Sequence, residues 1–171
     1  MIGDISCCKN GSFETLYREL IMALHTGMRK GEILNLTWDC VNLERRYLRI
    51  LNSKSGKPRH IPINEKLANE LNRLSRHNNY VFANPETGLP YVDLKKAFKS
   101  VKDKAEITGF RFHDLRHTVA TRMVANGTDL GVVMEILGHA DIKTTMRYAH
   151  PVRYTWAYRY KNDLKILTSC A

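Results

Sequence analysis

Six polar side chains spread along this chain supply the groups that a metal-free phosphoryl transfer needs. In chain order they are Arg29, Lys54, His113, Arg116, His139 and Tyr148. A phenol can attack and form a covalent intermediate, while guanidinium, ammonium and imidazole groups stabilise charge on phosphate oxygens or move protons. Because a phenol with its ordinary pKa of about 10 is a poor nucleophile near neutral pH, Tyr148 needs cations and a base close by.

The strongest local pattern is the pair His113 and Arg116 in the string FRFHDLRHTVA. Residues three apart share one face of a helix, so both side chains can meet one phosphate, with Arg116 making a two-pronged contact. The alternative is zinc, since His113 and His117 have the i, i+4 spacing of metal ligands and His139 could be a third. Asp114 stands where the HExxH motif has glutamate. We therefore favour the phosphate interpretation and predict no metal and no cofactor.

The elements that position these residues are mostly helices. Apolar spacing predicts helices over about residues 13–26, 29–36, 65–76, 93–106, 112–125, 129–137, 141–149 and 154–167. Three short strands, at 40–43, 47–51 and 59–63, should form a small antiparallel sheet. The turn between the last two carries Lys54 at the tip of a hairpin, with Lys57 as its nearest competitor. The fold class is thus α+β and predominantly α-helical.

Two of the candidate residues lie near the end of the chain, around short helices. Gly138 should end the helix over 129–137, which places His139 just past the stop. Asp141 resembles the cap of a short helix whose apolar stripe is Ile142, Thr145, Met146 and Ala149. Tyr148 falls off that stripe, so we predict that it does not fill the core.

The composition indicates a basic, single-domain protein. The chain has 171 residues, and 27 Lys and Arg outnumber 17 Asp and Glu, for a net charge of +10. Such an excess favours an anionic partner, nucleic acid before a membrane surface. No apolar run is long enough to span a bilayer and no secretory signal is visible, so we expect a cytoplasmic protein.

The four cysteines show no CxxC spacing and should be reduced thiols. Surface cations that could contact a nucleic-acid backbone are Lys57, Arg59, Lys95, Lys96, Lys99 and Arg147.

The strings HTGMRKGEIL, NSKSGKPRHIPI, FRFHDLRHTVA, LGHA and TTMRYAH occur in one order along the chain. In this the chain resembles the catalytic domain of the tyrosine recombinases, the phage-integrase-like site-specific DNA recombinases. The resemblance runs from about Phe13 to about Leu167. It implies that double-stranded DNA is the partner and that neither metal nor ATP is needed.

The resemblance also implies a role for each residue. Arg29, Arg116 and His139 would hold the scissile phosphate, and Tyr148 would be the nucleophile that forms a 3′-phosphotyrosyl link. Lys54 would be the general acid that protonates the leaving 5′ oxygen. His113 would be the general base that assists proton transfer from the nucleophile.

The expected domain organisation is a polar tail over 1–12 followed by a catalytic domain over 13–171. Members of this family usually carry an N-terminal helical domain that binds the other side of the DNA, and we expect it to be absent here. Self-association on DNA, as a synaptic tetramer in a full-length enzyme, would accompany a monomeric free state. Two alternatives remain: a DNA-binding or assembly fragment that is inactive without its N-terminal domain, and a type IB topoisomerase-like activity that only nicks and reseals.

Overall fold

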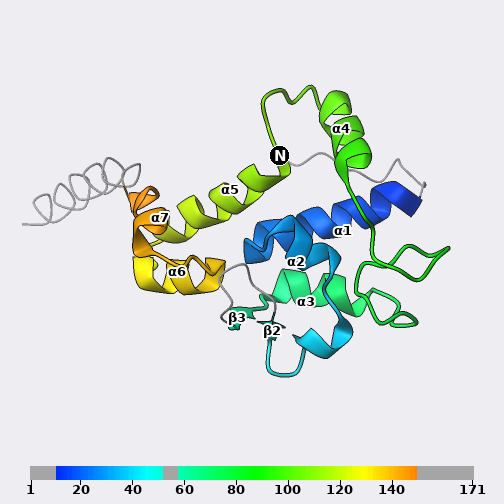
Figure 1. Ribbon diagram of the computed structural model, residues 1–171, viewed down its shortest axis with the longest axis horizontal. Coiled ribbons are helices and arrows are strands. Elements are labelled where there is room, and N and C mark those ends of the chain that lie inside the picture. The colour runs from blue at the N-terminus through cyan, green and yellow to red at the C-terminus, as the bar shows by residue number, and fades with distance from the viewer. Residues whose placement is uncertain (1–10, 52–57, 150–171) are drawn as a thin grey trace, which may run out of the picture.

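The computed structural model describes residues 11–51 and 58–149 (Figure 1). The helices are α1 Gly11–Thr26, α2 Lys30–Leu34, α3 Glu65–Asn72, α4 Lys95–Lys104, α5 Phe112–Ala125, α6 Leu130–Leu137 and α7 Ile142–Met146. The strands are β1 Val41–Asn42, β2 Tyr47–Ile50 and β3 Arg59–Pro62. The predicted hairpin turn with Lys54 and Lys57, the helix over 154–167 and most of the N-terminal tail lie outside the described residues.

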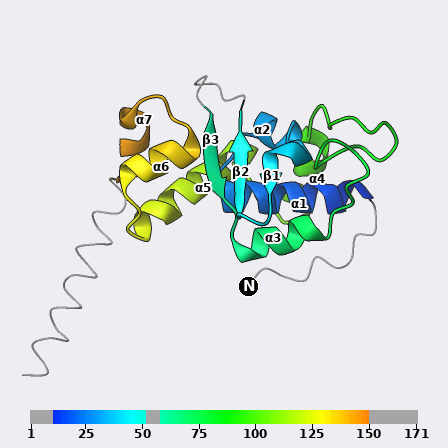
Figure 2. The ribbon, with the colours of Figure 1, turned by 90° about the horizontal axis from the view of Figure 1, so that it is seen from below.

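The three strands form one antiparallel sheet in the order β1-β2-β3. Leu48 on β2 lies opposite Val41 on β1 and Ile61 on β3. Figure 2 shows the sheet lying across α1, with α6 and α7 beyond the β3 edge. The predicted fold class, mainly helical with a small three-stranded antiparallel sheet, is therefore confirmed.

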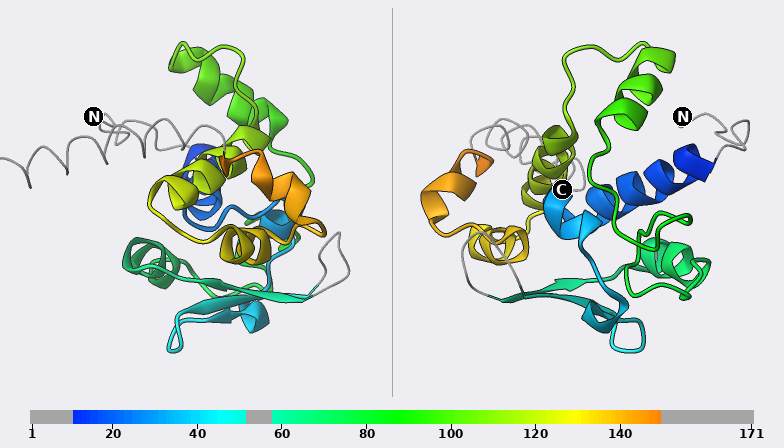
Figure 3. Two further views of the ribbon diagram at one scale, coloured as in Figure 1. Left: turned by 90° about the vertical axis from the view of Figure 1, so that its left-hand side faces the viewer. Right: turned by 45° about the vertical axis from the view of Figure 1, so that its right-hand side comes forward.

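The main hydrophobic core lies between α1, the sheet and α3. Met22 on α1, Leu48 and Ile61 on the sheet, and Leu67 on α3 are all at most 1% exposed. Alternation explains the inner face of β3, because Arg59 and Ile61 point inward while His60 and Pro62 point outward. Figure 3 shows the other face of α1 covered by α5, with α4 standing away from the sheet. Within the described residues, no helix is both long and apolar enough to cross a membrane.

Several helices are shorter than predicted, and local hydrogen bonds end α3 early. α3 ends at Asn72 rather than at about residue 76: the amides of Arg73 and Leu74 bond to carbonyls three residues back, at 3.2 Å. Arg76 instead lies over the ring of Trp38, 4.9 Å from its centroid. α4 begins at Lys95 rather than at 93 and ends at Lys104 rather than 106.

The predicted apolar stripe on the last described helix is wrong. Ile142 and Met146 are 38% and 48% exposed, whereas Thr145 is fully buried and Tyr148 is only 5% exposed. The helix α7 is only five residues long, and Tyr148 follows it with an amide bond to the carbonyl of Thr145, at 3.0 Å. Thr145 and Tyr148, three apart, therefore share the inward face. The prediction that Tyr148 stays out of the core is corrected: its ring packs in a buried cluster with residues of α5 and α6.

Candidate active site

Arg29 occupies the sharp turn between α1 and α2. The turn depends on Gly27, whose φ of 65° is the left-handed region, and a Cβ there would lie 2.7 Å from the side chain of Leu137. Arg29 then caps α2, as predicted, while the Glu32 carboxylate accepts from the Arg29 amide at 2.9 Å. The guanidinium donates to Glu32 at 2.9 Å and to the carbonyl of Gly138 at 3.0 Å. Arg29 is thereby fixed between α2 and the end of α6.

Arg59, at the start of β3, is a buried partner of the same carboxylate. Its two terminal nitrogens donate to the two Glu32 oxygens at 3.0 and 2.7 Å, and its Nε donates to the carbonyl of Ile136 at 2.9 Å. We expected Arg59 to be a surface cation facing a nucleic-acid backbone, and this is wrong, because its side chain is 4% exposed. The cause is the inward register of β3. Burial raises the pKa of Glu32, but hydrogen bonds from Arg59 and Arg29 outweigh it, so the net pKa is lowered and the carboxylate is ionised.

Arg116, on α5, completes the group of three arginines. It is 3% exposed and donates to the carbonyls of Gly27 at 2.8 Å and Leu137 at 2.5 Å. Its pKa is lowered to about 10 by burial and by the neighbouring Arg29, which leaves it protonated at neutral pH. The predicted pairing of Arg29 and Arg116 is present in space, since they donate to the adjacent carbonyls of Gly138 and Leu137.

The end of α6 organises all three arginines. Three consecutive carbonyls, of Ile136, Leu137 and Gly138, accept from Arg59, Arg116 and Arg29 in that order. The last carbonyls of a helix lack partners within the helix and carry its negative dipole end, so guanidinium groups suit them. Gly138 has φ 67°, and a Cβ there would lie 2.9 Å from the Arg59 guanidinium carbon. Glycine is therefore needed at this position both for the backbone turn and for space.

His139 follows directly, as predicted, and lies beside the nucleophile candidate. Its Nδ1 is 2.8 Å from the Thr145 hydroxyl, and its ring is parallel to that of Tyr148 with centroids 6.5 Å apart. The pKa of His139 is lowered to about 4, by burial first and then by Arg116 and Arg29. At neutral pH this imidazole is therefore uncharged.

The Tyr148 hydroxyl is held by His117, a residue that the sequence had suggested only as a possible zinc ligand. The Nδ1 atom of His117 lies 2.5 Å from the phenol oxygen. His113, the predicted base, is exposed and touches the His117 ring edge-on at 4.9 Å between centroids. The spacing was a signal for this, because His117 lies four residues after His113 and residues four apart share one face of a helix.

Glu32 and Arg59 were also missed as site residues. Glu32 stands three residues after Arg29, the position at which a glutamate closes a helix cap, and Arg59 shares the inward register of Ile61. Both signals were present in the sequence. Across residues 11–51 and 58–149, no group of three or more His, Cys, Asp or Glu side chains is arranged to hold a metal ion.

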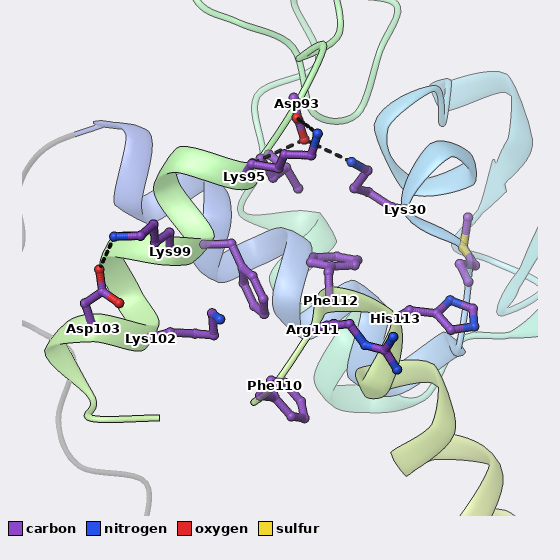
Figure 4. Close-up of a pocket in the computed structure, with 13 residues that line it drawn as sticks. Lys30, Asp93, Lys95, Lys99, Lys102, Asp103, Phe110, Arg111, Phe112 and His113 are labelled. Atoms are coloured by element: carbon purple, nitrogen blue, oxygen red, sulfur yellow. Dashed lines mark hydrogen bonds and ion pairs between the residues drawn. The ribbon is translucent and has the colours of Figure 1, made fainter. Parts of the chain in front are cut away.

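A cleft of about 600 Å³ lies between α4 and the start of α5 and is shown in Figure 4. The aromatic rings of Phe98, Phe110 and Phe112 line it, and His113 stands at its end. Lys30 and Lys95 both pair with Asp93, at 2.9 and 3.4 Å. Lys99 pairs with Asp103 at 2.9 Å. Exposed pairs of this kind contribute at most about 1 kcal/mol, so these lysines can exchange their carboxylates for another anion.

A mainly helical domain with a three-stranded antiparallel sheet is the fold of tyrosine recombinase catalytic domains. Residues 5–153 match the phage integrase family, and the chain belongs to that family. It is 34% identical over 139 residues to tyrosine recombinase XerA of Pyrococcus furiosus, covering 77% of this chain and 49% of that protein. It is 32% identical over 152 residues to the integrase of Salmonella phage P22, covering 80% and 39%.

Solved structures agree. The catalytic domain of bacteriophage HP1 integrase is 33% identical, with a TM-score of 0.63 over 79% of this chain and 74% of that one. The Tn1549 transposon integrase, solved in complex with a circular intermediate DNA, has a TM-score of 0.71 over 82% and 55%. At 22% identity it bears on the fold alone. The chain spans half or less of the length of the curated relatives it matches.

Proposed function

We propose that this chain is the catalytic part of a site-specific DNA recombinase, which cuts and rejoins double-stranded DNA through a 3′-phosphotyrosyl intermediate. The observation that carries the proposal is the convergence of Arg29 and Arg116 on adjacent carbonyls of Gly138 and Leu137. His139 comes next in the chain, and its ring is parallel to that of Tyr148. Four of the six residues expected from the sequence thus meet at one place.

The charges of the site support an anionic substrate. Burial and the nearby Arg116 lower the pKa of His113, and burial and the same arginine lower the pKa of His139 to about 4. The positive field that disfavours imidazolium is the field that would attract a phosphodiester. Arg29 and Arg116 each use two of their N–H donors on the protein, so others are left for phosphate oxygens.

In the proposed reaction the Tyr148 oxygen attacks the phosphorus of a phosphodiester. The new bond joins Oη to phosphorus, the bond from phosphorus to the 5′ oxygen breaks, and that oxygen leaves with a proton. A 5′ hydroxyl from a partner strand then attacks the phosphotyrosine and releases Tyr148. The number of phosphodiester bonds is conserved, which is why ATP is not required. Arg29 and Arg116 stabilise the charge that develops on the phosphorus oxygens, a task that metal ions perform in other phosphoryl transfers.

The remaining roles come from the resemblance. Lys54 donates the proton to the leaving 5′ oxygen, and His113 assists proton transfer from Tyr148. The basic net charge of +10 and the cleft lysines favour a DNA backbone as partner. Exchange between two duplexes requires several copies on DNA, so we propose that the chain assembles there and is a monomer when free.

The test is to trap the intermediate. The chain is incubated with supercoiled DNA in excess chelator, denatured abruptly, and the products are examined for protein attached to a 3′ end, with Tyr148→Phe as the control. The proposal requires an adduct in the unsubstituted chain and none in the variant. An adduct that needs added metal, or that survives in Tyr148→Phe, would reject the mechanism.

Two other outcomes correspond to the alternatives. Binding without any adduct, even on nicked DNA at low salt, would indicate a DNA-binding or assembly fragment. An adduct together with relaxation of supercoils but no exchange between two target duplexes would indicate a topoisomerase-like nicking and resealing activity. Salt dependence does not separate these functions, because phosphate contacts weaken with ionic strength in all of them.

A further inference from the structure

The phenol of Tyr148 has a specific partner that the proposed chemistry has not used. His117 lies on α5, one turn after His113, and its Nδ1 is 2.5 Å from the Tyr148 oxygen. The two rings are 5.7 Å apart between centroids and inclined at 45°, so the nitrogen lies at the hydroxyl edge and not over the ring face. With Tyr148 only 5% exposed, this contact is made away from bulk water.

The charges around His117 keep it able to accept a proton. Its pKa is lowered by burial first, then by Arg147 of the α7 end and by His113 and Arg116 of α5, while Asp114 acts in the opposite direction. The imidazole is therefore neutral at pH 7. Burial raises the pKa of Tyr148, so its hydroxyl keeps its proton. A neutral His117 that carries its hydrogen on Nε2 presents a lone pair at Nδ1, which is the arrangement Oη–H···Nδ1.

We propose that His117 is a catalytic residue of the proposed DNA cleavage, the immediate acceptor of the Tyr148 proton. As the Oη–phosphorus bond forms, the phenolic proton passes to Nδ1 and His117 becomes an imidazolium. When a 5′ hydroxyl later attacks the phosphotyrosine, Nδ1 returns the proton to the departing phenolate. The attacking hydroxyl gives its own proton to Lys54, which donated one to the leaving 5′ oxygen in the first step. Over both steps His117 is unchanged, so the proton balance closes without any further reactant.

The arrangement also explains why the phenol does not ionise before substrate arrives. In the free protein an imidazolium at position 117 would be opposed by Arg147 and Arg116, and Asp114 would offset them only in part. A phosphodiester held by Arg29 and Arg116 brings the missing negative charge and makes that imidazolium more favourable. The base is thus activated by the substrate. His113, exposed at the end of the cleft and in edge-on contact with the His117 ring, assists this transfer through His117.

The test measures single-turnover formation of the covalent adduct on nicked DNA by three chains: unsubstituted, His117→Ala and His117→Asn. The Asn amide can hydrogen-bond the phenol but cannot take its proton. General-base contributions are about 10²-fold or more, so both variants should be slowed by about that factor with unchanged DNA affinity. The matched control is His60→Ala, which removes an exposed histidine on β3 and should leave the rate unchanged.

A second measurement separates proton transfer from mere placement. Each chain is made with a fluorinated tyrosine at position 148, whose phenol has a lower pKa and needs less help from a base. If His117 accepts the proton, the fluorinated phenol should recover much of the rate lost in His117→Ala and do little in the unsubstituted chain. Full activity of His117→Asn, or equal effects of fluorine in both chains, would overturn the proposal and leave His117 a positioning residue.

The inference rests on the proposed function, and the two fail differently. If the unsubstituted chain forms no adduct that depends on Tyr148, the recombinase chemistry itself is wrong. If it forms that adduct and His117→Ala forms it equally fast, the chemistry stands and the assignment of His117 is rejected. Melting temperatures and DNA binding of all variants, measured alongside, identify any that fail through unfolding, and His117→Asn, which keeps a polar side chain, then carries the test.

Discussion

The two halves of the site are held in different ways. On the arginine side, Arg29, Arg59 and Arg116 come from three separate elements and donate to backbone carbonyls at the end of α6. On the tyrosine side, Tyr148 is held by a contact between side chains, with His117. His139 is likewise held by a side chain, the Thr145 hydroxyl.

This difference has a mechanical consequence. Backbone carbonyls at a helix end cannot rotate away, so the arginines of the proposed phosphate clamp are in place before any substrate binds. A phenol and an imidazole each turn about their own side-chain torsions, and exchanging one hydrogen bond costs only about 1 kcal/mol. The Tyr148 hydroxyl can therefore adjust its direction while the arginines stay fixed.

The arginine side should break most severely at Glu32. In Glu32→Gln the buried Arg59 loses the carboxylate that it contacts with both terminal nitrogens. Removing one partner of a buried pair costs about 3–5 kcal/mol, so the free energy of unfolding should fall by about that amount. Urea denaturation measures it.

The control for this change is Glu70→Gln, which removes a partner of the well exposed Arg73 just past α3 and should cost below about 1 kcal/mol. If Glu32→Gln and Glu70→Gln lost the same free energy of unfolding, the arginines would not be held in place through Glu32. The arginine side would then be no more firmly held than the tyrosine side.

A second change acts on the close approach at Gly138. Gly138→Ala adds a Cβ 2.9 Å from the Arg59 guanidinium at φ 67°. The left-handed backbone alone costs about 1–2 kcal/mol for a residue with a Cβ. Gly109 has φ 68° with nothing within 4 Å of a Cβ, so Gly109→Ala measures that backbone cost by itself.

The difference between the two glycine variants isolates the contact with Arg59. We expect Gly138→Ala to be less stable than Gly109→Ala by a further 1–3 kcal/mol, about the cost of overpacking, and to cleave DNA more slowly. Thermal or urea unfolding gives the first quantity and the trapping assay the second. If Gly138→Ala and Gly109→Ala lose the same stability, the Arg59 guanidinium moves to make room for the added Cβ. The arginine side is then less rigid than its contacts indicate.

The parts of the fold that the sequence predicted are those with local causes. Gly138 stops α6, as expected, and α1 and α6 end and begin close to the predicted residues 26 and 129, because such signals act within a few residues. The alternation in β2 and β3 and the helical spacing in α5 were likewise readable. Local patterns also pointed to Arg29, at the cap of α2, and to Arg116, which shares a face of α5 with His113.

The parts that the sequence did not predict depend on contacts between distant segments. Arg59 was assigned to the surface because its partners Glu32 and Ile136 lie 27 and 77 residues away. His117 meets Tyr148 across 31 residues. The inward turn of Tyr148 follows from α7 packing on α6, which no pattern within a five-residue helix specifies. Contacts between distant segments therefore determine where Tyr148 and His117 lie, while local signals were enough to point to Arg29 and Arg116.

Acid should weaken the tyrosine side. The pKa of His139 in the folded chain is about 4, below its usual value of 6.5. Between these values the unfolded chain binds a proton that the folded chain does not, so the free energy of unfolding should fall as pH drops from about 6.5 to 4. Since His139 is partly exposed, the slope should be below about 1.4 kcal/mol per pH unit.

His139→Asn removes this proton difference, so its stability should depend less on pH over the same range. His60→Asn, at an exposed position on β3, is the matched control. Urea unfolding at pH 7 and pH 5 for the three chains measures the effect. Parallel losses in all three would show that acid acts elsewhere in the molecule and would leave the tyrosine side no more sensitive than the rest.

The smallest effect is expected where a single hydroxyl holds His139. Thr145 is fully buried, and its oxygen lies 2.8 Å from Nδ1 of His139. Thr145→Val keeps the shape and removes the hydrogen bond, so it should cost about 1 kcal/mol and slow adduct formation modestly, because His139 can turn away from the phosphate. Thr145→Ser keeps the hydroxyl and loses only a methyl group, so its cleavage rate should stay nearer that of the unsubstituted chain. If instead Ser is slower than Val, packing against α6 rather than the hydrogen bond positions His139, and the tyrosine side is held by its core as firmly as the arginines are held by their carbonyls.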